Sequence, residues 1–174
     1  MSANVLRQDG HEEFANSLAA FAEALFGLAT VGGSRSDYLR TKAVARAMVA
    51  ARLANEAAKA RVCAYRSLIQ SFLGAAEAQE LDADPPAPAM AMRLRKPRSA
   101  EAELVLGAVQ RLAPLEKAAL LLVVVERFSY AEAAVVMEMD ALALRSALAR
   151  GREAFAARLA STKGGGRAHL RLVG

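Results

Sequence analysis

Arginine side chains recur on one face of the last predicted helix, which spans about residues 141–159. Arg145, Ala149 and Arg152 follow one another at steps of four and three, and Ser146 and Arg150 lie beside them. A guanidinium group can donate two hydrogen bonds to O6 and N7 of guanine, or it can hold phosphate oxygens. This face is therefore predicted to enter the major groove of DNA. The alternative is a solvated arginine face on a purely structural helical hairpin.

The distribution of charge agrees with a polyanion-binding C-terminal end. The net charge is +5, and residues 145–174 carry 7 basic side chains against 1 acidic one. The preceding residues 101–144 carry 3 basic side chains and 7 acidic ones. An acidic block followed by a basic block favours contact between the basic end and a polyanion. A solvated helix face with a basic tail remains the alternative.

Other kinds of chemistry have little support in the sequence. A single cysteine, Cys63, and two histidines, His11 and His169, predict no disulfide framework, no metal site and no cofactor. No nucleophile stands near a suitable base, so an enzyme is not expected. The longest apolar run has eight residues, whereas a membrane helix needs about 20. The acidic start differs from a secretory leader, so we expect a cytoplasmic protein with no membrane insertion.

Short polar signals predict the elements that position the arginines. Residues Ser129 to Glu132 fit a capping box, which begins a short helix ending at Met137. After a three-residue break, Asp140 can cap the last helix. Two helices joined in this way predict a helix-turn-helix. Its buried stripe consists of Leu144, Leu148, Phe155 and Leu159, with Gly151 allowing another helix to come close.

The composition predicts an all-α fold made of two helical domains, because Ala and Leu dominate and β-branched residues are few. A Pro-rich linker is expected at residues 82–99, between domains at 11–81 and 100–160. A flexible basic tail is expected at 161–174. In the N-terminal domain, Phe14, Leu18, Phe21, Leu25 and Leu28 mark one helix face. Residues 37–60 and 61–74 form either one further helix or two. In the C-terminal domain, helices are predicted at about 100–111 and 115–126, with Pro114 at the start of the second.

The residues from Leu112 to Arg152 resemble region 4 of bacterial sigma factors of the extracytoplasmic-function class. That family has a "Leu-x-Pro" start, then "Gly-Leu-Ser-Tyr-x-Glu-Ala-Ala", then "Val-Lys-Ser-Arg-Leu-x-Arg-Ala-Arg". The positions in register are Ser129, Tyr130, Glu132, Ala133, Ala134, Ser146, Leu148, Arg150 and Arg152, and Arg145 replaces the usual Lys. The resemblance implies promoter DNA and core RNA polymerase as partners. The implied DNA contacts are Arg145, Ser146, Arg150, Arg152, Ser129 and Tyr130.

The same family has a second module, region 2, before a flexible linker. The residues Asp37-Tyr38-Leu39-Arg40 stand where that module has "Asp-Leu-Val-Gln", and Ala64-Tyr65 stand where it has "Ala-Trp". This placement makes Asp37, Tyr38 and Arg40 candidate polymerase contacts. The N-terminal half matches the family in layout more than in residues.

Several residues depart from the region 4 pattern. Arg127 and Glu138 stand where the family has Gly, Leu142-Ala143 replace Gly-Thr, and Ala147 replaces an Arg. A hydroxyl that contacts phosphate is therefore missing. These departures leave open a degenerate sigma factor, for which an anti-sigma partner is expected, or a sigma-factor mimic that binds an anti-sigma protein with little DNA binding. A helical adaptor whose Arg face meets an acidic protein is a further alternative.

Overall fold

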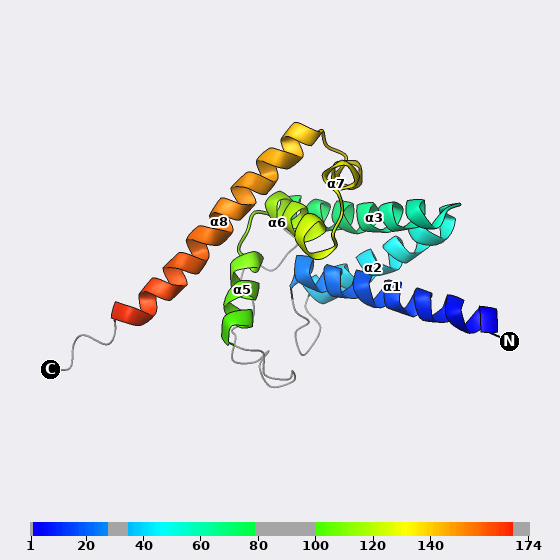
Figure 1. Ribbon diagram of the computed structural model, residues 1–174, viewed down its shortest axis with the longest axis horizontal. Helices are drawn as coiled ribbons and strands as arrows, with labels where there is room; N and C mark the ends of the chain where they lie inside the picture. Colours follow the sequence, from blue (N-terminus) through cyan, green and yellow to red (C-terminus); the bar gives the residue numbers. More distant parts are fainter. Residues whose placement is uncertain (1, 28–34, 79–99, 169–174) are drawn as a thin grey trace.

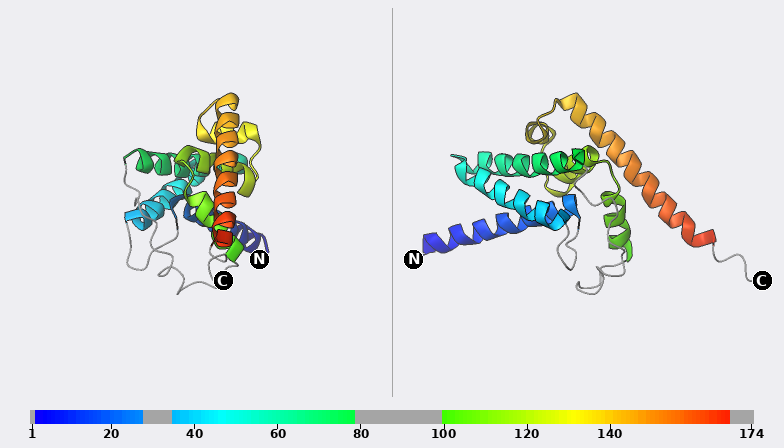
Figure 2. Two further views of the ribbon diagram at one scale, coloured as in Figure 1. Left: turned by 90° about the vertical axis from the view of Figure 1, so that its left-hand side faces the viewer. Right: turned by 180° about the vertical axis from the view of Figure 1, so that it is seen from behind.

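A computed structural model describes residues 2–27, 35–78 and 100–168 of the chain. These residues form helices and no strand, so the all-α prediction is confirmed. The helices pack against one another. The N-terminal part of α1 and the C-terminal part of α8 extend beyond the packed helices at opposite ends of the molecule (Figures 1 and 2). The predicted linker, residues 82–99, lies outside the described residues.

The N-terminal half consists of α1 (Ser2–Phe26), α2 (Arg35–Leu53) and α3 (Ala57–Glu77). The second and third helices are separate, because Glu56 adopts an extended backbone (φ −134°, ψ 142°) before α3 begins. In α1, Leu18, Phe21 and Leu25 are buried, as their spacing predicts, whereas Leu28 lies outside the described residues. Gly27 ends α1 with a φ of 95°, a conformation that glycine adopts without steric cost.

Small side chains bring α2 and α3 together. Ala43 and Ala47 on α2 are buried, while the larger Tyr38 and Leu53 of the same helix are exposed. On α3, the predicted stripe of Tyr65, Leu68, Ile69 and Phe72 is buried. The Ala-rich side of α2 thus allows the close approach of α3, whose large residues fill the core.

The C-terminal half begins with α5 (Ala100–Gln110) and α6 (Pro114–Leu120), and Pro114 occupies the first turn of α6 as predicted. The helix expected to continue to residue 126 changes at η1 (Leu121–Val125), which is a π-helix. The N–H of Glu126 donates to Leu121 O at 3.1 Å, five residues back, and the N–H of Phe128 donates to Leu122 O at 3.1 Å. This wider turn ends the helix and leads into the helix-turn-helix.

The last two helices are α7 (Tyr130–Met137) and α8 (Ala141–Ala168). The short helix ends where the sequence predicts, but α8 continues past Leu159. The tail expected from residue 161 is therefore helical as far as Ala168. Each residue added to an existing helix adds a backbone hydrogen bond, and no proline interrupts this stretch, so the glycines at 164–166 do not end the helix.

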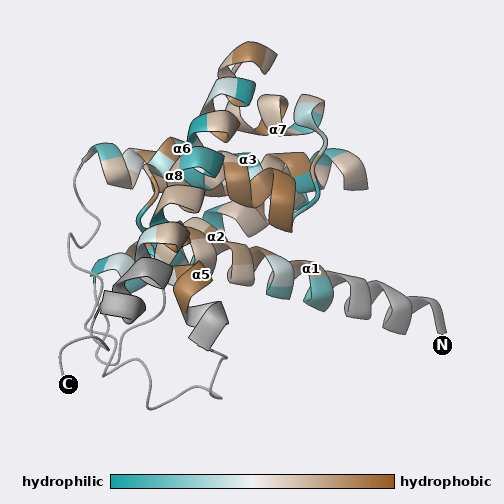
Figure 3. Cartoon of the chain, turned by 60° about the vertical axis from the view of Figure 1, so that its left-hand side comes forward, coloured by the Kyte–Doolittle hydropathy of each residue, from teal (hydrophilic) through white to brown (hydrophobic). Residues whose placement is uncertain are grey.

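One hydrophobic core serves both halves. Buried residues of α1 and α3 join those of α6, η1, α7 and α8 in a single cluster. In Figure 3, hydrophobic residues gather where the helices meet, and the first turn of α8 at the top of the view is also hydrophobic. The two halves are thus folded together in this structure, with α7 lying against α3 (Figures 1 and 2).

Candidate DNA-binding surface

Both helices of the helix-turn-helix begin at side-chain caps, as the sequence predicts. The backbone N–H of Glu132 donates to Ser129 Oγ at 3.2 Å, and the N–H of Ser129 donates to Glu132 Oε2 at 2.9 Å, which completes the capping box. The Ser129 hydroxyl, and then its backbone N–H, hold the pKa of Glu132 below its ordinary value. At α8, the N–H of Ala143 donates to Asp140 Oδ1 at 2.7 Å. The start of each helix is therefore fixed by local contacts.

The helix α8 has a buried side and an exposed side. Leu144, Ala147 and Leu148 are buried in the core, whereas Arg145 and Ser146 are exposed. Gly151 lies on the buried side, where an added Cβ would meet Glu116 O and Leu120 Cδ1 at 3.3 Å. A side chain there would have to displace these atoms by a few tenths of an ångström, so glycine allows α8 to lie this close to α6.

Two of the three arginines predicted to contact DNA already have protein partners. The Nε of Arg150 lies 3.1 Å from Glu116 Oε1, in an ion pair between α8 and α6. Arg152 donates from Nη2 to the Tyr130 hydroxyl at 3.3 Å, which brings the middle of α8 to the start of α7. Among the described contacts, none holds the side chain of Arg145. The structure thus separates one unengaged arginine from two that are held in place.

The two departures Arg127 and Glu138 share one unusual backbone conformation. Their φ values are 59° and 53°, in the left-handed region that favours glycine. The resembled family has Gly at both positions, and these φ values give the physical reason, since a side chain in this conformation costs about 1 kcal/mol. Arg127 ends the turn after η1, and Glu138 forms the turn between α7 and α8.

The turn residue Glu138 is held by the N-terminal half. Gln70 on α3 donates from Nε2 to Glu138 Oε2 at 2.8 Å, and the Nε of Arg66 lies 3.6 Å from Glu138 Oε1. Arg66 also donates from Nη2 to Val135 O at 3.0 Å, at the end of α7. These contacts attach α3 to the turn of the helix-turn-helix, and nothing in the sequence pattern predicts them.

A second set of contacts anchors the segment that precedes α7. Arg61 donates to the backbone O of Glu126, and its guanidinium lies 3.9 Å from the centroid of the Phe128 ring. The Tyr65 hydroxyl lies against the carboxylate of Glu126 and 3.1 Å from Ser17 Oγ. Burial, and then the hydrogen bond to Glu126, raise the pKa of Tyr65 well above its ordinary value. The hydroxyl therefore stays protonated and donates to Glu126.

Lys117 forms a buried polar contact between the halves. Its side chain is 7% exposed, and its Nζ donates to Leu25 O at 3.3 Å and to Gln110 Oε1 at 3.1 Å. The same Gln110 donates to Ala24 O at 3.0 Å, so α5, α6 and α1 meet at this point. Burial lowers the pKa of Lys117 from its ordinary 10.5 to about 8. Residue type alone predicts an exposed lysine on α6, so sequence reasoning missed it.

The candidate polymerase contacts are gathered in the first turns of α2. Asp37 Oδ1 and Arg40 Nη2 form an ion pair at 3.1 Å, and Arg40 also donates to Gly27 O at 3.3 Å. Tyr38 is 64% exposed, with the ammonium group of Lys42 5.7 Å from the centroid of its ring. Two of the three residues therefore have local partners, while the Tyr38 ring faces outward.

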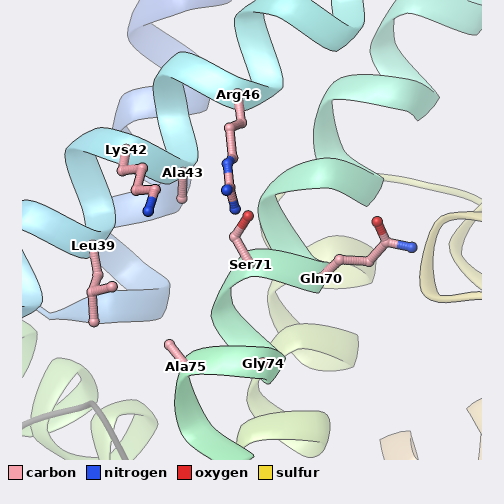
Figure 4. Close-up of a pocket in the computed structure, with 8 residues that line it drawn as sticks. All are labelled: Leu39, Lys42, Ala43, Arg46, Gln70, Ser71, Gly74 and Ala75. Carbon is pink, nitrogen blue, oxygen red and sulfur yellow. The ribbon is translucent and has the colours of Figure 1, made fainter. Parts of the chain in front are cut away.

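A hollow of about 250 Å³ lies between α2 and α3 (Figure 4). Lys42 and Arg46 reach into it from α2, and Ser71 faces them from α3. The Ser71 hydroxyl donates to Ser67 O at 2.9 Å, so it is engaged by its own helix. The residues around this hollow include no acid–base pair beside a nucleophile.

Features of two other kinds of site are absent from the described ranges. In residues 2–27, 35–78 and 100–168, no cluster of three or more metal-ligating side chains is found. No described helix is long and apolar enough to cross a membrane.

The geometry defines a class of protein domain: a capped two-helix unit whose second helix leaves a polar face uncovered is a helix-turn-helix of the DNA-binding type. The comparison with known families agrees. Residues 102–155, about a third of the chain, match the family model described as Sigma-70, region 4. The C-terminal half therefore carries a sigma-70 region 4 domain, a non-enzymatic domain of transcription factors. No curated protein matches the chain at a significant level.

Proposed function

We propose that this chain is a sigma factor of the extracytoplasmic-function class, which directs RNA polymerase to promoters from the cytoplasm. The observation that carries the proposal is the exposed position of Arg145 and Ser146 near the start of α8, inside the stretch that matches region 4. Residues near the N-terminus of a recognition helix are the ones that reach base edges in the major groove.

The proposed roles follow from how each side chain is held. Arg145 is free to donate to guanine, and Ser146 is beside it to contact a base edge or a phosphate. Arg152 and Tyr130, which lie 3.3 Å apart through Nη2 and the hydroxyl, would meet a phosphate together, near the capped start of α7 at Ser129. Arg150 would exchange Glu116 for a phosphate when DNA arrives. This set divides into one base reader and several positioning contacts.

The proposed roles of the other parts of the chain follow from their order along the sequence. Residues 11–81 would bind core RNA polymerase, with the exposed Tyr38 ring as a contact and the Asp37–Arg40 pair shaping the surface beside it. Residues 82–99 would connect this unit to residues 100–160. Promoter opening would draw on binding free energy, with no bond made or broken by the chain.

The alternative proposal is a mimic that binds an anti-sigma protein and scarcely contacts DNA. It is favoured by the contacts of Arg66 and Gln70 with Glu138, which attach the helix-turn-helix turn to α3. The Leu142-Ala143 pair, which lacks the hydroxyl of the resembled pattern, favours it as well. A regulator of this kind would keep the halves together when bound.

Transcription in vitro with core polymerase separates the two proposals. We expect promoter-dependent transcripts from the full chain, and a loss of about 10- to 100-fold in promoter binding for Arg145→Ala. Arg152→Ala should weaken binding to all sequences and reduce the salt dependence by about one counterion. Arg52→Ala, which removes the same charge from an exposed position at the end of α2, is the matched control.

The absence of transcripts, together with tight binding to an anti-sigma protein, would favour the mimic. Equal losses for Arg145→Ala and Arg52→Ala would mean that general charge, and not the α8 face, governs binding.

A further inference from the structure

Leu142 is 74% exposed, the largest exposed fraction among the large hydrophobic residues described in the C-terminal half. It is the second residue of α8, three and four positions before Arg145 and Ser146. Residues at these separations lie on one face of a helix, so Leu142 extends the proposed DNA-facing surface by one turn toward the N-terminus. Leu144, two positions later, points into the core instead.

This face of α8 combines polar and apolar side chains, which limits the base edges that it can recognise. Arg145 offers donors and Ser146 offers a hydroxyl, but Leu142 can neither donate nor accept a hydrogen bond. In the major groove, the 5-methyl group of thymine is the apolar feature, and the other edges present polar atoms. A leucine pressed against a polar edge would leave that edge without its water partners, at a cost in free energy.

We propose that Leu142 reads the methyl group of a thymine next to the guanine contacted by Arg145. This inference rests on the proposed DNA-binding function and adds a base preference to it. The rise of an α-helix places Leu142 about 4.5 Å along the axis from Arg145. Base pairs are spaced by about 3.4 Å, so the thymine lies about one or two base-pair steps from the guanine.

The test uses the full chain alone at low salt, because low salt strengthens every phosphate contact. Duplexes are first selected from a random pool, and each thymine of the selected sequence is then replaced in turn by deoxyuridine, which lacks only the methyl group. We expect one replacement, within two base pairs of a required guanine, to lower the affinity about fourfold, as for the loss of one buried methyl group.

The variants assign that effect to the side chain. Leu142→Ala should bind the thymine and deoxyuridine duplexes equally, whereas Leu142→Met should keep most of the difference. Leu53→Ala is the matched control, because Leu53 is 78% exposed at the end of α2 and lies outside the α8 face. It should retain the fourfold difference. Neither Leu142 nor Leu53 packs in the core, so both variants are expected to fold.

The outcomes distinguish this inference from the proposed function. Sequence-selective binding that no deoxyuridine replacement weakens, or a weakening that persists in Leu142→Ala, overturns the inference and leaves the function in place. Tighter binding of Leu142→Ala to all duplexes also overturns it, since Leu142 would then crowd the phosphate backbone. The absence of any sequence-selective binding overturns the DNA-binding function itself, and the inference with it.

Discussion

The two halves of the chain are ordered by different kinds of contact. In the C-terminal half, α6 starts at Pro114, α7 at a capping box and α8 at Asp140, so each start is fixed by residues within a few positions. In the N-terminal half, Glu56 precedes α3 without making any side-chain cap hydrogen bond. Small and aromatic residues that pack against other helices order this half instead. Local signals therefore define one half, and tertiary packing defines the other.

The contacts between the halves complicate this division. Tyr65, Arg61 and Lys117 each join the N-terminal half to the C-terminal half through a polar group, and buried residues of both halves share one core. The C-terminal half, whose helices start at strong local signals, is therefore still held in position by contacts with the N-terminal half. The contrast between the halves predicts how each should respond when such a contact is removed.

Removal of Tyr65 should have the largest effect. The residue is 1% exposed and its ring packs edge-on against Phe21 at 4.9 Å and Phe128 at 5.1 Å between ring centroids. Tyr65→Ala should lower the free energy of unfolding by about 3–5 kcal/mol, as for large aromatic residues in cores. Urea unfolding followed by circular dichroism measures the change.

The shape of the Tyr65→Ala transition tests the shared core. A single cooperative transition is expected, because the cavity lies between the halves. Two separate transitions would mean that the halves fold independently. Tyr65→Phe keeps the ring and removes only the hydroxyl, which contacts Glu126. This variant should lower the free energy of unfolding by about 1–3 kcal/mol.

Lys117 should make stability depend on alkaline pH. Its pKa is about 8 in the folded chain against an ordinary 10.5, so between these values the unfolded state binds more protons and stability rises with pH. The free energy of unfolding should increase by about 2–3 kcal/mol between pH 7.5 and 10, relative to Lys117→Met. Urea unfolding at both pH values measures this difference. Parallel pH profiles for the two proteins would contradict it.

Loss of the Ser129 cap should have a smaller effect. Ser129→Ala removes the acceptor of the Glu132 N–H and should lower the free energy of unfolding by about 1 kcal/mol. The matched change in the N-terminal half is Glu56→Ala. Glu56 holds the N-cap position of α3, as Ser129 does in α7, but its side chain makes no cap hydrogen bond. Thermal unfolding should show a clear loss for the first variant and little for the second. Equal losses would remove the distinction between the halves.

The smallest effects are expected at the two left-handed residues. Arg127→Gly should raise the free energy of unfolding by about 0.5–1 kcal/mol, because glycine tolerates a φ of 59° without steric cost. Glu138→Gly relieves a similar strain but also removes the contacts with Arg66 and Gln70. Its net gain should therefore be smaller, as urea unfolding of both variants will measure. A larger gain at Glu138 would mean that its contacts with α3 contribute nothing.

The sequence was sufficient for features that depend on near neighbours. Ser129 and Glu132 form their box, Asp140 caps α8, and Leu144 and Leu148 are buried, because caps and helical periodicity are encoded within a few residues. The exposed face that carries Arg145 and Ser146 follows from the same periodicity. Whether these residues contact DNA stays a prediction.

Features that depend on distant residues could not be read in this way. The engagement of Arg150 by Glu116 arises where α8 meets α6, and the sequence predicted a continuous helix where η1 forms a π-turn. The buried ammonium group of Lys117 is likewise invisible in the pattern, since its oxygen partners come from α1 and α5. The run of glycines at 164–166 predicted that α8 would end before it, but the helix continues through these residues to Ala168 because its backbone hydrogen bonding is continuous.

The anchoring of Glu126 and Phe128 by α3 has a consequence for exchanging parts between proteins. These residues lie directly before α7, so the tilt of the helix-turn-helix is inherited from Arg61 and Tyr65 in the other half. A chimera that grafts residues 100–168 onto a foreign N-terminal partner keeps its caps and its arginines. Without Arg61 and Tyr65, the helix-turn-helix of the chimera is no longer held in the same orientation, so its arginines point in a different direction.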